Sequence, residues 1–203
     1  KSTSESLWDI SNEKTLPDSI RPVTMKAAED ALKTLRDGTV ADRRQLSAEL
    51  NGLYGLYADR IELGQNDVHM LLVTDTGLGE MAGAVLVDFL RDQGWSSIGC
   101  YAPSRLTTAT ADEFSQGMKN LINWCERIIP GYQRAGYEII FNLTGGFKSL
   151  QGYLTIVGMF YADRIVTIFE TANELLTIPH LPIDLDKSVF QEHRVALALM
   201  AEE

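Results

Sequence analysis

The sequence predicts an α/β fold built around a mainly parallel sheet. Short apolar runs rich in β-branched residues alternate along the chain with longer segments whose apolar residues recur every three or four positions. This alternation is typical of a Rossmann-like sheet with helices on both faces and right-handed crossovers. The last two apolar runs lie only a few residues apart, which favours a C-terminal β-hairpin at the sheet edge.

The individual elements follow from local patterns. VHMLLVT at residues 68–74 and YEIIFNL at residues 137–143 are apolar almost throughout, as expected for strands buried on both faces. The other strands are expected at residues 97–101, 164–170 and 175–179. Helices are expected at residues 25–35, 42–61, 79–93, 111–129, 149–161 and 187–200. With no repeat and no linker, we expect a single domain over residues 1–203.

Composition excludes several classes of function. The 203 residues include 18 Lys and Arg against 28 Asp and Glu, a net charge of −10, which argues against binding to a long nucleic acid but leaves a small anionic ligand open. The chain has no long apolar run and a polar start, so we expect a cytoplasmic protein without a membrane span. The two Cys and three His residues lack metal-ligand spacing, so we expect no metal and no cofactor.

Three loops follow strands at the sheet edge where such folds bind ligands: residues 74–77, 102–105 and 142–148. The third carries the clearest signal. Gly145 and Gly146 let the backbone approach a ligand, Thr144 can donate a hydrogen bond, and Lys148 adds a charge beside the exposed N–H groups of a helix start. It is not a Walker A loop. The alternative is a tight turn followed by a solvated lysine.

The other candidate residues leave two interpretations open. Asp75 could cap the following helix or bind a sugar hydroxyl, since a carboxylate would repel a phosphate. Arg105 could contact a base or phosphate, or be an ordinary exposed arginine. Ser47 and Glu49 are expected within the helix at residues 42–61, where a solvated polar face or a hydrogen-bonded glutamate would explain them.

Together the motifs resemble a known family. SAEL at 47–50, LLVTDTG at 71–77, FNLTGGFK at 141–148, IFE at 168–170 and IPHLPI at 178–183 occur in the order seen in the CARF domain of type III CRISPR systems. The likeness covers about residues 40–185. It is strongest to stand-alone ring nucleases and to the CARF sensor halves of ribonucleases.

The resemblance implies a homodimer that binds a cyclic oligoadenylate, most often cyclic tetra-adenylate, across its two-fold axis. In ring nucleases of this kind the ribose 2′-hydroxyl attacks its own phosphate without a metal ion. The family normally opens with a strand ending in a Gly-Thr-Ser-like loop, so we expect such a strand before residue 1. The implied catalytic residues are Lys148 with Ser2 and Ser4, and the implied ligand-binding residues are Thr3, Thr74, Asp75, Thr76, Gly77, Arg105, Asn142, Thr144, Gly145, Gly146 and Phe147.

Two other functions fit the sequence less well. A CARF domain that only binds the ring would activate a fused or partner effector nuclease, although no RxxxxH motif of a HEPN ribonuclease occurs in this chain. A dinucleotide-dependent dehydrogenase would require GxGxxG after the first strand, and that motif is missing. The sequence therefore favours a ring nuclease that switches off type III CRISPR signalling, with a non-cleaving sensor as the alternative.

Overall fold

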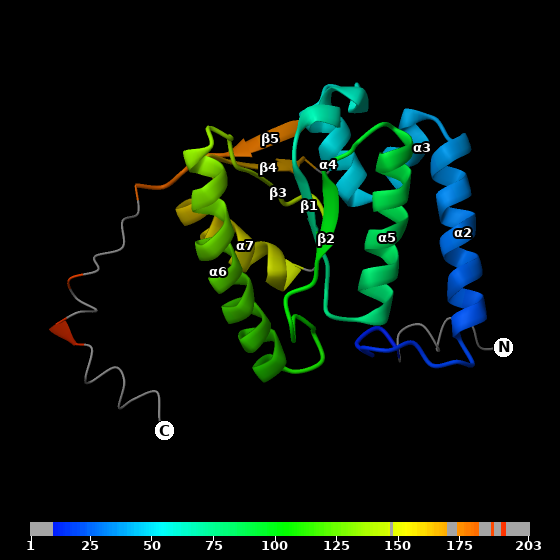
Figure 1. Ribbon diagram of the computed structural model, residues 1–203, viewed down its shortest axis with the longest axis horizontal. Coiled ribbons are helices and arrows are strands. Elements are labelled where there is room, and N and C mark those ends of the chain that lie inside the picture. The colour runs from blue at the N-terminus through cyan, green and yellow to red at the C-terminus, as the bar shows by residue number, and fades with distance from the viewer. Residues whose placement is uncertain (1–9, 147, 170–173, 183–187, 189–191, 194–203) are drawn as a thin grey trace.

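The computed structural model of this chain describes residues 10–146, 148–169, 174–182, 188 and 192–193. Its elements form three layers, so the predicted α/β architecture is confirmed. In Figure 1, α6 and α7 lie on one side of the strands, and α5 and α2 lie on the other. The elements are α2 (Arg21–Asp37), α3 (Val40–Leu46), α4 (Ala48–Leu56), the 3₁₀ helix η1 (Ile61–Asn66), β1 (His69–Leu72), α5 (Gly77–Asp92), β2 (Ile98–Tyr101), α6 (Ala111–Arg134), β3 (Ile140–Asn142), α7 (Lys148–Tyr161), β4 (Arg164–Ile168) and β5 (Leu175–Ile178).

The described strands pair in two groups. β1 and β2 are parallel, with His69 opposite Ile98. β3 and β4 are also parallel, and β5 runs antiparallel to β4 with Ile165 opposite Ile178, which confirms the expected hairpin. β1 and β3 each pair along one edge only among the described strands. The sheet predicted as continuous is therefore divided between β1 and β3 in the described part of the chain.

Two large groups of buried side chains fill the spaces between the layers, and a third, smaller group contains Leu143 and Ile165. One includes Tyr54 of α4 and Phe89 of α5 and lies on the side of the strands that α4 and α5 cover. The other is built around α6 and α7 and includes Leu121. Leu72 of β1 and Phe141 of β3 both pack against this second group. The two strand groups therefore share one core layer, although they do not pair with each other.

The single helix expected at residues 42–61 is wrong. α3 ends at Leu46, and Ser47 has an extended backbone with φ −138° and ψ 126°. The Ser47 hydroxyl accepts a hydrogen bond of 3.2 Å from the N–H of Leu50 and thereby caps α4. The expected position of Ser47 inside a helix is wrong for the same reason, whereas Glu49 does lie in a helix, in the first turn of α4.

Two other helices are longer than expected. α2 begins at Arg21, with Pro22 in its first turn, where a missing N–H costs no helical hydrogen bond. α6 continues through Pro130 instead of ending before it. Burial of Ile129 and the ring contact of Tyr132 with Tyr137 support the last turns of α6. Most of the helix expected at residues 187–200 lies outside the described residues.

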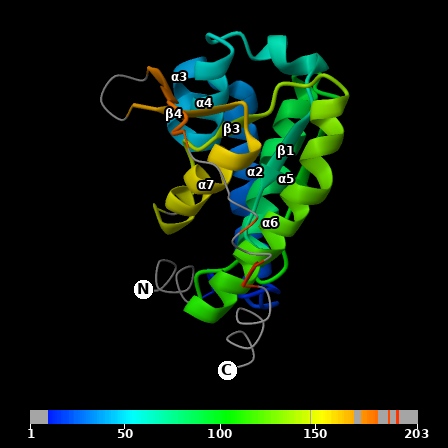
Figure 2. The same cartoon turned by 90° about the vertical axis from the view of Figure 1, so that its left-hand side faces the viewer.

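α4 connects the two halves of the core. It packs against β3, β4 and β5, and Figures 1 and 2 both show it beside β4 at one end of the molecule. Leu50, Leu53 and Tyr54 on the same helix belong to the core group around α5. The start of α4 therefore has a fixed position relative to the loop that follows β3. No helix in the described ranges is long and apolar enough to cross a membrane.

Candidate functional site

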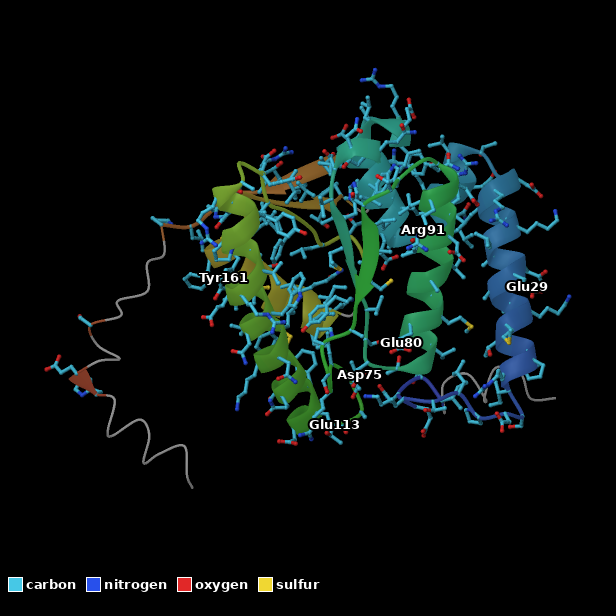
Figure 3. All side chains as sticks on the ribbon, in the orientation of Figure 1. Glu29, Asp75, Glu80, Arg91, Glu113 and Tyr161 are labelled. Atoms are coloured by element: carbon cyan, nitrogen blue, oxygen red, sulfur yellow. The ribbon has the colours of Figure 1, made fainter. Side chains whose placement is uncertain are left out.

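The loops after β1 and β2 are joined directly. The N–H of Asp75 donates a 2.9 Å hydrogen bond to the carbonyl of Leu106, and the N–H of Arg105 donates a 2.8 Å bond to the Asp75 carboxylate. Figure 3 shows Asp75 at the lower end of the strands, between α5 and α6. No hydrogen bond or ion pair between described residues links these two loops to the loop after β3. The structure therefore brings together two of the three predicted loops by direct contact.

Asp75 has a structural role that the sequence did not indicate. Asp75 is 8% exposed. Its carboxylate also accepts a 3.0 Å hydrogen bond from the ammonium of Lys14. The idea that Asp75 caps α5 is wrong, because Thr76 does so by accepting a 3.1 Å bond from the N–H of Gly79. The short Thr76 side chain reaches its own helix start, whereas Asp75 ties the N-terminal segment to the loop after β2.

The N-terminal segment also covers the start of α5. The N–H of Gly77 donates a 2.9 Å hydrogen bond to the carbonyl of Glu13, and a Cβ on Gly77 would meet the Leu16 side chain. In Figure 1 this dark-blue segment runs below the lower end of α5. Thr74 Oγ1 lies 3.0 Å from Thr76 Oγ1. The polar groups of residues 74–77 are thus largely used within the protein, and their predicted contacts with a ligand stay a prediction.

Arg105 has two distinctive features. Its φ is +64°, in the left-handed region that residues other than glycine seldom adopt. Its guanidinium forms a 3.0 Å ion pair with Asp112, and about half of its side chain is exposed. This ion pair agrees with the interpretation of Arg105 as an ordinary exposed arginine. A ligand phosphate that contacted the Arg105 guanidinium would have to compete with the Asp112 carboxylate.

The loop after β3 is organised by Asn142. The side-chain oxygen of Asn142 accepts hydrogen bonds from the N–H of Thr144 at 3.2 Å and from its hydroxyl at 2.7 Å. The Asn142 amide nitrogen donates a 3.2 Å bond to the carbonyl of Glu49. In this conformation the hydroxyl hydrogen of Thr144 is used by Asn142, so its predicted donation to a ligand stays a prediction. Its oxygen is still an acceptor.

Two glycines allow the loop and α4 to touch, and a third makes the turn in the loop. A Cβ on Gly52 would overlap the side chains of Asn142 and Thr144, and a Cβ on Gly145 would overlap Oε1 of Glu49. Gly146 has φ +97°, which favours glycine for conformational reasons. The two loop glycines therefore serve different needs: one admits the Glu49 carboxylate and the other makes the turn.

Gln151, in the first turns of α7, holds the other side of the loop. Its amide nitrogen donates to the carbonyls of Leu143 at 3.3 Å and Gly145 at 3.2 Å. Both carbonyls are thereby tied to the first turn of α7. Sequence reasoning missed Gln151 and Gly52. The only available signal was a polar residue one turn after Lys148 in an otherwise apolar helix.

Lys148 is the first residue of α7 and is exposed. No ion pair between described residues involves it, so its ammonium can contact a ligand. The partial positive charge at the start of the 14-residue helix α7 adds to the charge of Lys148. Phe147, together with Ser2, Thr3 and Ser4, lies outside the described residues.

A separate surface hollow of about 300 Å³ lies between β2 and α6. Tyr101 and Trp124 stack in its wall, with ring centroids 4.5 Å apart. The hollow reaches the loop after β2 through Ser104 and does not include the loop after β3. Its lining residues are Tyr101, Ser104, Asn120, Asn123, Trp124 and Arg127.

The fold and the loop define a class: an α/β layered protein whose glycine loop at a strand end is held against a neighbouring helix. The family model described as CRISPR-associated protein (Cas_APE2256) matches residues 44–181, which include α4 and every described strand. The chain belongs to this CRISPR-associated family.

Proposed function

We propose that this protein binds cyclic tetra-adenylate through the loop at residues 142–148 and cleaves it without a metal ion. The observation that carries the proposal is the exposed ammonium of Lys148 at the start of α7, which forms no ion pair with any described residue and lies two positions after the glycine turn at Gly146. Gln151 ties two loop carbonyls to α7, and the N–H groups at the start of this helix are suited to accept a phosphate. Membership of a CRISPR-associated family and the motif resemblance to CARF domains support the choice of ligand.

The chemistry needs no protein nucleophile. The ribose 2′-oxygen attacks the adjacent phosphorus, the bond from phosphorus to the 5′-oxygen breaks, and the 5′-oxygen takes up a proton. The product carries a 2′,3′-cyclic phosphate and a 5′-hydroxyl. Lys148 and the amide groups at the start of α7 would stabilise charge on the phosphoryl oxygens and hold the three reacting atoms in line. Ser2 and Ser4 stay predicted contributors of a hydroxyl.

A homodimer fits a symmetrical ring. One protomer supplies one Lys148, whereas a ring of four identical nucleotides presents equivalent phosphates on its two halves. Two copies related by a two-fold axis would place the same loop against each half. The proposal therefore includes a second copy of this chain as partner, and no long nucleic acid.

The direct test is to incubate the purified protein with cyclic tetra-adenylate in EDTA and to separate protein-bound ligand from products by chromatography with mass detection. We expect linear di-adenylate ending in a 2′,3′-cyclic phosphate. Activity that is lost in EDTA and restored by a divalent ion would contradict the metal-free mechanism. Absence of both binding and cleavage would overturn the proposed function.

The second candidate function is a sensor that binds the ring without cleaving it. The bonded hydroxyl of Thr144 favours this alternative, because the one hydroxyl described in the loop already donates to Asn142. The same chromatography separates the two functions: a sensor would retain intact ligand through prolonged incubation. Its effector would then be a fused or partner nuclease.

A further inference from the structure

The first turn of α4 directs a carboxylate at the candidate loop. The Ser47 hydroxyl accepts from the N–H of Leu50 and donates a 2.8 Å hydrogen bond to Oε2 of Glu49. This bond fixes the Glu49 carboxylate, and its other oxygen, Oε1, lies against Gly145 where a Cβ would otherwise stand. The main chain of Glu49 is held in addition by Asn142. Glu49 is thus attached to the loop at two points.

This carboxylate has an unusual setting. Glu49 is half-buried, and no described cation forms an ion pair with it. No described donor bonds to Oε1. A carboxylate beside a phosphate-binding loop repels the phosphate. Without a cation paired to it, the Glu49 carboxylate therefore weakens the binding of a phosphate group to this loop. It can nevertheless accept a proton from a neutral hydroxyl group of the same ligand.

Resting on the proposed function, we infer that Glu49 is the general base of ring cleavage. Its Oε1 takes the proton of the ribose 2′-hydroxyl as the 2′-oxygen forms its bond to phosphorus. The bond from phosphorus to the 5′-oxygen breaks, and the 5′-oxygen receives a proton from water or from the ammonium of Lys148. The proton held by Glu49 then returns through water to whichever group protonated the 5′-oxygen, which restores both the carboxylate and that donor. Atoms and charge balance without a metal ion or co-reactant.

The experiment compares wild type with Glu49→Gln, Glu49→Asp and Glu62→Gln. The last makes the same chemical change at an exposed glutamate of η1. Single-turnover cleavage of cyclic tetra-adenylate is followed from pH 4 to pH 8, and binding is measured separately with a ring whose 2′-hydroxyls are replaced by fluorine. We expect Glu49→Gln to slow cleavage by about 100-fold or more, as typical for loss of a general base. Its binding of the fluorinated ring should remain within a few-fold of wild type.

The pH profile identifies the base. Wild type should slow as the solution is acidified, Glu49→Gln should lose this acidic limb, Glu49→Asp should keep it with a reduced rate, and Glu62→Gln should match wild type. An unchanged cleavage rate and pH profile in Glu49→Gln would overturn the assignment of the general base but not the proposed function. Equal loss of binding and cleavage would also overturn it, because Glu49 would then only hold the loop. If the wild-type protein binds the ring without cleaving it, the assignment of Glu49 as a general base is overturned but the proposed binding site stands. If the wild-type protein does not bind the ring, both proposals are overturned.

Discussion

The side-chain amide of Asn142 donates a 3.2 Å hydrogen bond to the main-chain carbonyl of Glu49, 93 positions earlier in the sequence. The oxygen of the same amide accepts both the N–H and the hydroxyl of Thr144. One neutral side chain therefore fixes the loop after β3 internally and fastens it to the first turn of α4. The conformation of the candidate site therefore depends on the Asn142 side chain, which donates one hydrogen bond and accepts two.

Asn142→Ala should destabilise the fold and weaken ring binding. The Thr144 N–H and the Glu49 carbonyl lose their partners, which should lower the free energy of unfolding by about 1–3 kcal/mol. Denaturation in urea and equilibrium binding of cyclic tetra-adenylate measure the two effects. Asn123→Ala, at an exposed position on α6, is the matched control and should change neither. Wild-type affinity in Asn142→Ala would show that this anchor does not shape the binding site.

Gly52→Ala should disturb the same loop from the other side. The added methyl group would overlap the side chains of Asn142 and Thr144, and overpacking of this kind costs about 1–3 kcal/mol of stability. Gly152→Ala is the control, because that helical glycine is exposed and a Cβ there meets no heavy atom within 4 Å. It should stabilise α7 by about 0.5–1 kcal/mol. Urea denaturation of both variants should therefore give shifts of opposite sign; shifts of the same sign would contradict the close approach at Gly52.

Local patterns were sufficient for much of the fold and for the position of one loop. The apolar runs that became β1 and β3 and the glycines at 145 and 146 are short-range signals, so the strand-to-helix turn ending at Lys148 could be located from them. The break at Ser47 could not, because apolar spacing continues from Leu46 to Leu50. Its cause is a side-chain cap, which a periodic pattern does not register.

Long-range contacts set the remaining limit. Lys14 has no periodic signal to associate it with Asp75, yet the two form an ion pair that uses much of the carboxylate. Strand pairing is equally non-local, and the division between β1 and β3 was not predicted. The contacts of Ser2, Thr3, Ser4 and Phe147 stay predictions.

Acidification should destabilise the protein through His69. Its ring stacks on Trp95 with centroids 3.8 Å apart, and its Nε2 lies 3.1 Å from the carbonyl of Gly64. Burial lowers the pKa of His69 below its usual value, opposed in part by Gly64 and the charge of Asp67. Between that lowered pKa and about 6.5, the unfolded chain binds more protons than the folded one. The stabilisation is therefore complete above about pH 6.5 and is lost as pH falls.

Urea denaturation at pH 7.5, 6.5 and 5.5 measures this dependence. His69→Gln should have a smaller loss of stability between pH 7.5 and 5.5 than wild type, although its stability at pH 7.5 is also reduced by loss of the stacked ring. His180→Gln, at an exposed position, should keep the wild-type slope. A slope that is the same in wild type and His69→Gln would assign the pH dependence to other groups.

Lys148→Ala should abolish cleavage and weaken ring binding. A charge-assisted contact with phosphate is worth about 1.5–3 kcal/mol, which corresponds to about a 10-fold to 150-fold loss of affinity. Lys148 is exposed at the start of α7, so its removal should leave the free energy of unfolding within about 0.5 kcal/mol of wild type. Binding is measured by titration with the fluorinated ring, and cleavage by chromatography in EDTA.

Two further variants separate a specific phosphate contact from a general effect of charge. Lys119→Ala removes the same charge from an exposed position on α6 and should reduce neither affinity nor rate appreciably. Lys148→Arg keeps the charge but replaces a compact ammonium by a planar guanidinium, so it should retain more binding than cleavage. If Lys148→Ala and Lys119→Ala lowered affinity equally, the loss would reflect the change in net charge and not a specific contact, and the assignment of the site to the loop after β3 would be wrong.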